Sequence, residues 1–234
     1  MEVSSDHPMT EESEAGPYLY SSDRPMLHRF VPAECARLLD VGCYAGGFGR
    51  GLKARREIDI WGVEPLSAPA AVAARHLDKV VNDWFTDDAE IPDSSFDAVM
   101  FNDSLEHFPD ADMALQLCRK KLKQGGVLIC SIPNVRFIEN LEHLLLQRDW
   151  QYEDRGIRDR THLRFFTKKS MKRTLEQNGY EVLEQTGINE DWWRREKFLR
   201  RIAFRLFPSL TDDMRFIQYV NVARMVNIES LGST

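Results

Sequence analysis

Short apolar segments alternate with helical segments along most of this chain, and this alternation constrains the fold more than any other feature of the sequence. The segment RLLDV (37–41) leads through a glycine-rich turn and a helical stretch to IDIWGVE (58–64), within the length of one βαβ unit. Parallel strands need such crossovers and become buried on both faces, in keeping with the apolar character of both segments. The alternation therefore predicts a doubly wound α/β fold.

The same alternation continues downstream and supplies the remaining elements. Further strands are expected at 79–81, 96–101, 127–132 and 180–188, and helices at 68–77, 111–123, 134–147 and 167–179. The segment 215–226 is long enough to pair as a last, antiparallel strand. Together these segments predict a mostly parallel seven-stranded sheet with helices on both faces.

The N-terminal segment departs from this pattern. Residues 1–16 are polar and acidic without apolar periodicity, which is typical of a disordered tail, and residues 17–234 are expected to form one domain. No apolar run approaches the ~20 residues that cross a bilayer, and the first residues lack the basic lead and apolar stretch of a signal peptide. A cytoplasmic protein is therefore expected.

Charge and cysteine content argue against two classes of site. The 234 residues include 31 Lys and Arg against 37 Asp and Glu, a formal net charge of −6, whereas a nucleic-acid partner requires a basic surface. We therefore expect no nucleic-acid partner. Cysteines stand in or beside apolar runs without metal-ligand spacing, so we expect buried free thiols at Cys35, Cys43, Cys118 and Cys130.

The stretch LLDVGCYAGGFG (38–49) is the most informative part of the sequence. A buried strand ends in Asp40 and runs into Gly42 and Gly46 at a helix start, where small residues let the backbone approach a ligand. Glu64 ends the second strand about 20 residues onward, where an acidic side chain can accept hydrogen bonds from both ribose hydroxyls. The spacing G-x-x-x-G-G differs from the dinucleotide pattern, and no basic residue stands beside the glycines to hold a pyrophosphate. This disfavours NAD and FAD.

Four motifs follow one another at a family-specific spacing: LLDVGCYAGGFG, WGVEP (61–65), FDAVMFNDSLEHFPD (96–110) and LKQGGVLICSIPNV (122–135). In this order they resemble class I S-adenosylmethionine-dependent methyltransferases, from about Tyr18 to Val226. The resemblance implies S-adenosylmethionine as cofactor and S-adenosylhomocysteine as product. One departure is Tyr44, which stands where the family usually has a second glycine.

The resemblance also implies which residues would contact this cofactor. They lie at the carboxyl ends of the first four strands and in the turns that follow. By this resemblance the methionine end would be lined by Asp40, Gly42 and Gly46, the ribose hydroxyls bound by Glu64, the adenine bordered by Asn82, Asp83 and Trp84, and the sulfonium and amino acid approached by Asn102. Further candidates for cofactor contact are Cys43, Tyr44 and Pro65. Arg24, before the first strand, is a candidate partner for the cofactor carboxylate.

The cofactor would supply an activated methyl group, so the protein must align an acceptor atom with it and help remove the acceptor's proton. The N-P-P-Y type of motif found in methyltransferases of base amino groups is absent; NDSLEH (102–107) stands there instead. This stretch resembles the D/E-x-x-E-H segment of hydroxyl methyltransferases, and DRTHLRFFT (159–167) contains a second histidine. We therefore expect O-methylation, with His107 or His162 as general base or, alternatively, as structural residues.

A further resemblance offers a metal-assisted alternative. A family that methylates the terminal 2′-hydroxyl of small RNAs has a similar E-x-x-E-H segment and a downstream histidine that bind a divalent ion. By that resemblance the ligands here would be Asp103, Glu106, His107 and His162, although Asp103 replaces a glutamate of that pattern. The metal would lower the pKa of a vicinal diol.

The acceptor is less constrained than the cofactor. SIPNVRF (131–137) and DRTHLRFFT resemble bacterial methyltransferases that act on sugars, so a hydroxyl of a sugar, glycan or glycosylated metabolite is expected. A phenolic, quinone-like acceptor and a non-catalytic cofactor-binding module are the alternatives. The charged aromatic loop 148–166 and the basic amphipathic helix 191–207 would form a lid on the acceptor side. The helix also fits contact with a membrane surface or an anionic carrier lipid.

Overall fold

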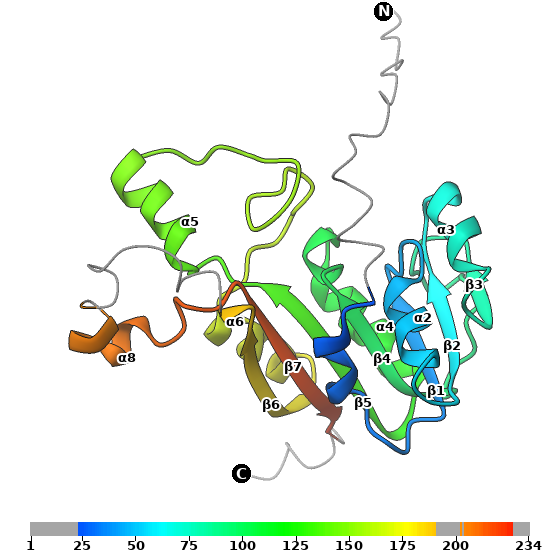
Figure 1. Cartoon of the computed structure of the whole chain (residues 1–234). Helices are drawn as coiled ribbons and strands as arrows, with labels where there is room; N and C mark the ends of the chain where they lie inside the picture. The colour runs from blue at the N-terminus through cyan, green and yellow to red at the C-terminus, as the bar shows by residue number, and fades with distance from the viewer. Residues whose placement is uncertain (1–22, 191–201, 203, 227–234) are drawn as a thin grey trace, which may run out of the picture.

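The computed structural model of the protein describes residues 23–190, 202 and 204–226. Within these residues seven strands form one sheet in the order β3-β2-β1-β4-β5-β7-β6 (Figure 1). The strands are β1 (Arg37–Val41), β2 (Asp59–Val63), β3 (Lys79–Val81), β4 (Phe96–Asn102), β5 (Leu122–Pro133), β6 (Tyr180–Ile188) and β7 (Gln218–Met225). The first five strands are parallel, and β7 pairs antiparallel with both β5 and β6. The predicted fold class is confirmed.

Helices cover both faces of this sheet. They are α2 (Gly47–Lys53), α3 (Ser67–Ala73), α4 (Ala111–Lys121), α5 (Ile138–Glu142), α6 (Lys168–Gln177) and α8 (Pro208–Thr211), with the 3-10 helices η1 (Pro25–Phe30) and η2 (Leu105–His107) and the π-helix η3 (His143–Gln147). Thr167 caps α6 as the sequence predicts, because its side chain accepts a hydrogen bond from the Ser170 N–H at 3.0 Å and the Ser170 hydroxyl accepts one from the Thr167 N–H at 2.8 Å.

The core has two parts, one on each face of the sheet. Neighbouring residues of one strand alternate between them: Leu39 packs with Val99 and Phe101 on one face, while Leu38 packs with Met100 on the other. All of these side chains are fully buried. This agrees with a parallel sheet that is covered on both sides. The four cysteines are free and buried, as predicted.

Several boundaries differ from the sequence expectation; the helix expected at 68–77, for example, ends at Ala73 in α3. Strand β5 begins at Leu122 because the turn containing Gly125, at φ 81°, is accommodated as an irregularity in its pairing with β4. The expected helix at 134–147 begins only at Ile138, after a hydrogen-bonded turn in which Phe137 N donates to Asn134 O at 2.9 Å. Strand β7 begins at Gln218 rather than 215.

Some sequence predictions concern segments outside the residues that the structure describes. Residues 1–16 and most of the basic helix 191–207 lie outside the described residues, so the tail, the single domain over 17–234 and the membrane contact stay predictions. In the described ranges no helix has both the length and the apolar character needed to cross a bilayer.

The order of the strands determines where a ligand can bind. Strand β1 lies between β2 and β4, with Val41 level with Val63 on one side and Phe101 on the other. The strands that follow β1 in sequence are added on both sides of it, β2 and β3 on one side and β4 and β5 on the other. In doubly wound sheets, ligands bind at the carboxyl ends of the strands where the strand order reverses in this way. The residues after β1, β2 and β4 therefore meet at one edge.

Candidate functional site

The turn after β1 is compact and depends on glycine. Gly42 has φ 75°. It lies so close to the turn that follows β4 that a Cβ added to it would be 2.6 Å from the Cβ of Ser104. The Ser104 hydroxyl in turn donates to the Val41 carbonyl at 2.6 Å. Gly46, at φ 73°, packs against Ala73 of α3. Both glycines therefore allow the ends of β1 and β4 and helix α3 to come together.

Glu64 connects this turn to the end of β2. Its carboxylate accepts hydrogen bonds from the Tyr44 N–H and the Leu66 N–H, both at 2.9 Å. Burial raises the pKa of Glu64, and these two donors act in the opposite direction. Each carboxylate oxygen can accept a second hydrogen bond, so the carboxylate can hold the turns in place and still bind ribose hydroxyls.

The predicted adenine residues lie beside edge strand β3. The Asn82 side chain donates to the carbonyls of Glu64 (2.8 Å) and Pro65 (3.1 Å), which joins the ends of β2 and β3. Asp83 accepts from the Trp84 N–H at 2.7 Å, and the Trp84 side chain is 67% exposed.

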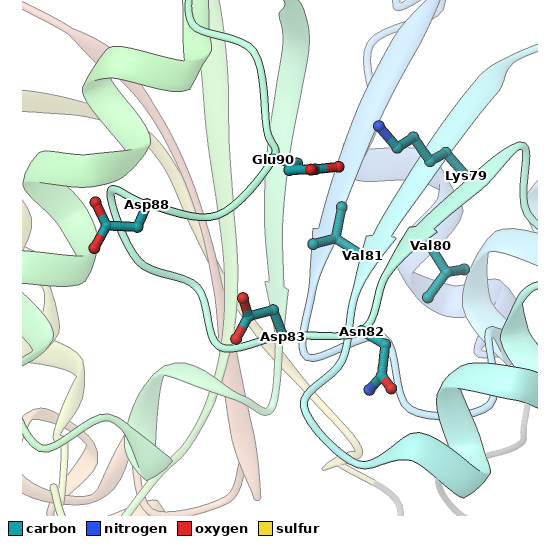
Figure 2. A pocket seen from close by; sticks show the side chains of 7 residues that line it. All are labelled: Lys79, Val80, Val81, Asn82, Asp83, Asp88 and Glu90. Carbon is teal, nitrogen blue, oxygen red and sulfur yellow. The ribbon is translucent and has the colours of Figure 1, made fainter.

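A cavity of about 420 Å³ opens along β3. Figure 2 shows side chains from the strand and from the loop that follows it; the lining residues are Lys79, Val80, Val81, Asn82, Asp83, Asp88 and Glu90. Two of the three predicted adenine residues therefore line this cavity.

Asp40 and Cys43 are both buried at the end of β1. Cys43 packs against Gly62, where an added Cβ would be 2.5 Å from its sulfur, and burial raises the pKa of the thiol. Asp40 is 1% exposed, and among the described residues its Oδ1 has no hydrogen-bond partner. Burial raises the pKa of Asp40 to about 7, with Glu64 adding to the rise and Arg24 opposing it. Asp40 is thus a buried carboxyl with unused acceptor capacity.

Arg24 and Asp103 form an ion pair that a third side chain completes. Gln218 donates to Asp103 Oδ2 at 2.6 Å and accepts from Arg24 Nη2 at 3.1 Å, so each of the three side chains bonds the other two. Ser131 donates to the other Asp103 oxygen at 3.0 Å, and Asn189 donates to the Gln218 carbonyl oxygen at 2.7 Å. The sequence motifs contain no signal for Gln218 or Asn189, which come from β7 and the turn after β6.

The other three predicted catalytic residues form a separate cluster. Glu106, His107 and His162 each offer a ligand atom, and these atoms lie within 4.8 Å of one another. The imidazole centroids are 4.8 Å apart, and His162 Nε2 lies 3.8 Å from Glu106 Oε1. Two backbone N–H groups of the loop after His162 donate to the Glu106 carbonyl, at 2.9 and 3.0 Å, and hold the loop against η2.

Burial changes the protonation of this cluster. Glu106 is 1% exposed, and both of its carboxylate oxygens lack a hydrogen-bond partner among the described residues. Burial, and then the charge of Asp103, raise the pKa of Glu106 well above its usual value. Burial, and then His107, lower the pKa of His162, so this imidazole stays neutral near pH 7.

The sequence predicts that Asn102 and the aromatic 148–166 loop each form part of the site. Asn102, the last residue of β4, is half-buried, and its Oδ1 has no hydrogen-bond partner in the described part of the chain. In the 148–166 loop the rings of Trp150 and Phe165 meet edge to face at 5.2 Å, and Phe165 lies 6.4 Å from the His162 ring. The loop thus brings aromatic surface toward the histidines.

This chain is similar to a known family of proteins and to several of its members. The family described as "Methyltransferase domain" matches residues 18–185. The ubiquinone biosynthesis O-methyltransferase of Nitrobacter winogradskyi is 28% identical over 158 residues, which cover 65% of this chain and 59% of that protein. The protein of the same name from Alkalilimnicola ehrlichii is 36% identical over 107 residues, 43% of each chain. This chain therefore spans less than two thirds of the length of these relatives.

Solved structures show the same fold. A chain of the complex between the Haloferax volcanii Trm112 methyltransferase activator and the putative methyltransferase has a TM-score of 0.62 and 16% identity, over 89% of this chain and 90% of that one. A SAM dependent methyltransferase from Archaeoglobus fulgidus has a TM-score of 0.57 and 22% identity, over 85% and 90%. At these identities the likeness concerns the fold alone.

Proposed function

This chain belongs to the methyltransferase-domain family, and from that premise we propose that it transfers the methyl group of S-adenosylmethionine to a hydroxyl of a phenolic or quinone-like acceptor. The observation that carries the proposal is the cluster of the buried Glu106 and His162 with the half-buried His107, at the edge of the sheet where this fold binds its ligand. The names of the curated relatives support a quinone-like acceptor. The sugar or glycan acceptor expected from two sequence motifs has no support among them.

The residues at the ends of β1 and β2 fit S-adenosylmethionine. The Gly42 turn lets backbone approach a ligand, and Glu64 retains acceptor capacity for the two ribose hydroxyls. The Asp40 Oδ1, which has no partner in the described part of the chain, can accept from the ammonium of the methionine end. When bound, the cofactor supplies a methyl group on a positively charged sulfur.

The chain's own contribution to the chemistry is to orient the hydroxyl and to accept its proton. His162 Nδ1 lies 3.2 Å from the carbonyl oxygen of Ile157, which can only accept, so Nδ1 carries the ring proton and Nε2 has the free electron pair. Because burial lowers the pKa of His162, the ring is available as a neutral base near pH 7. The rings of Trp150 and Phe165 offer a surface against which a planar acceptor can stack.

The cluster also fits a divalent ion. Two imidazoles and one carboxylate are common ligands of zinc and of first-row transition metals, and the Glu106 oxygens, which have no hydrogen-bond partner among the described residues, can serve as ligand atoms. Such an ion would be held by Glu106, His107 and His162 and would lower the pKa of the acceptor hydroxyl. Asp103, which sequence resemblance adds to this set, is instead bonded to Arg24, Gln218 and Ser131.

Release of S-adenosylhomocysteine tests the proposal. The full chain is incubated with S-adenosylmethionine and either a catechol or a nucleotide sugar. We expect product with the catechol and none above background with the nucleotide sugar. Turnover with the nucleotide sugar alone would show that the acceptor is a sugar and not a phenol or quinone. If the chain does not bind S-adenosylhomocysteine, the proposed methyl transfer is wrong as well.

A further inference from the structure

A short polar chain leads from Asp159 to the ring of His107. Asp159 is 4% exposed, and its Oδ1 accepts two hydrogen bonds from Thr161, from the backbone N–H at 2.8 Å and from the hydroxyl at 2.6 Å. The Thr161 hydroxyl oxygen is also 3.1 Å from His107 Nδ1, and the Thr161 carbonyl oxygen is 3.2 Å from the same nitrogen. Thr161 is thus in contact with both the buried carboxylate and the imidazole.

The direction of these hydrogen bonds follows from the number of protons. A hydroxyl has one proton, and the 2.6 Å contact with the Asp159 carboxylate takes it. The hydroxyl oxygen can then only accept from His107, and so can the Thr161 carbonyl oxygen. Both contacts therefore require a proton on Nδ1 of His107. In the neutral ring this leaves the free electron pair on Nε2.

We propose that Asp159 and Thr161 are positioning residues that fix the orientation and tautomer of His107, so that Nε2 is its proton-accepting or cation-binding atom. Asp159 directs the Thr161 hydroxyl proton away from the ring, and Thr161 holds the ring by two acceptors. Which reaction uses His107 rests on the proposed function, whereas the tautomer does not. A carboxylate that orients a histidine through a hydroxyl serves the same purpose as one that bonds the ring directly.

The second histidine is held in the same way from the same loop. The Ile157 carbonyl fixes the proton of His162 on Nδ1, so a loop segment of six residues, 157–162, sets the tautomer of both rings. Both rings then offer Nε2, and for His162 this atom is the one 3.8 Å from Glu106. Two imidazoles that both offer Nε2 can act on one ligand.

Two substitutions of Thr161 separate the hydroxyl from the rest of the side chain. Thr161→Val keeps the branched shape and removes the hydroxyl, whereas Thr161→Ser keeps the hydroxyl. Both keep the backbone N–H that bonds Asp159 and the carbonyl that faces His107. Because His162 is bonded to Ile157 and not to Thr161, its ring serves as an internal control.

The tautomer is measured by long-range ¹H–¹⁵N NMR of the full chain with ¹⁵N-labelled histidine at about pH 8.5, where unperturbed imidazoles are neutral. His107→Gln assigns the signal. We expect the Nδ1–H form of His107 in the wild type and in Thr161→Ser, and a roughly two- to tenfold shift toward the Nε2–H form in Thr161→Val. Nε2–H as the main wild-type form, or an unchanged ratio in Thr161→Val, overturns the proposal.

Turnover supplies a second readout. With a catechol acceptor, Thr161→Val should lower kcat about three- to tenfold at an unchanged KM for S-adenosylmethionine, and Thr161→Ser should restore it. Equal kcat for the valine variant and the wild type would overturn the positioning role. If the wild type shows no turnover while the NMR result holds, the proposed function fails and the positioning of His107 stands.

Discussion

Glu64 accepts a hydrogen bond from the N–H of Tyr44, and the bond holds a non-glycine residue in a left-handed conformation. The N–O distance is 2.9 Å, and Tyr44 has φ 46°, a region that costs an L-residue roughly 1–2 kcal/mol. The same carboxylate fixes the turn after β2 through Leu66. A side chain expected only as a ribose ligand therefore also maintains the shape of the turn in which the methionine end would lie.

Removal of the Glu64 carboxylate should weaken cofactor binding by two routes. Glu64→Ala deletes the hydrogen bonds to the ribose and releases the Tyr44 turn, so we expect the affinity for S-adenosylhomocysteine to fall roughly tenfold to a hundredfold by calorimetry. Glu57→Ala is the control, because Glu57 is an exposed glutamate just before β2. Equal affinity of the wild type and Glu64→Ala would remove Glu64 from the cofactor site.

Asp40 should make the stability of the free protein depend on pH. Its pKa is about 7 in the fold and about 3.8 in the unfolded chain, so the unfolded state loses its proton first as the pH rises. The stabilisation is therefore complete below about pH 4 and is lost progressively up to about pH 7.

The Asp40→Asn variant isolates this contribution. Relative to the wild type, its free energy of unfolding in urea should increase by roughly 3 kcal/mol between pH 5 and pH 8. Asp88→Asn, at an exposed aspartate, should show no such change relative to the wild type. A constant difference between Asp40→Asn and the wild type across this range would show that Asp40 is ionised throughout.

Gln218 should matter for cofactor binding although it lies outside every motif. It bonds both Arg24 and Asp103, so Gln218→Met should let the expected partner of the cofactor carboxylate move and lower the affinity for S-adenosylhomocysteine about three- to tenfold. Gln185→Met is a matched control, because Gln185 joins β6 to Asn221 of β7 at 2.7 Å without reaching Arg24. Equal losses in both variants would point to general loosening of the β6–β7 pair.

The sequence predicts this fold well because the determining signals are local. Apolar segments with glycine turns locate all seven strands, and the spacing from Gly42 to Glu64 brings two adjacent strand ends together. The partners of Asp103 could not be found in this way. Insertion of β7 between β5 and β6 places Gln218 beside Arg24, and no periodicity within a segment reports contacts across the sheet. The sequence motif therefore could not show that Asp103 is bonded to Arg24 and Gln218, and its role as a metal ligand stays a prediction.

The two histidines should determine turnover but not cofactor affinity. If the two histidines remove the proton of the substrate hydroxyl, His107→Ala and His162→Ala should each lower kcat by roughly 10²–10⁴. The affinity for S-adenosylhomocysteine should stay unchanged. His76→Ala, in the segment between α3 and β3, is the control and should match the wild type.

A chelator then distinguishes a general base from a bound cation at the same three side chains. We expect the wild type to keep its turnover in excess EDTA, because the neutral His162 ring can accept a proton without a metal. Loss of turnover in EDTA that Mn²⁺ or Co²⁺ restores would assign the step to a cation instead. In that case Glu106→Gln should abolish Mn²⁺ binding in equilibrium dialysis while Asp103→Asn retains it, since Asp103 is bonded to Arg24 and Gln218 and lies outside the cluster.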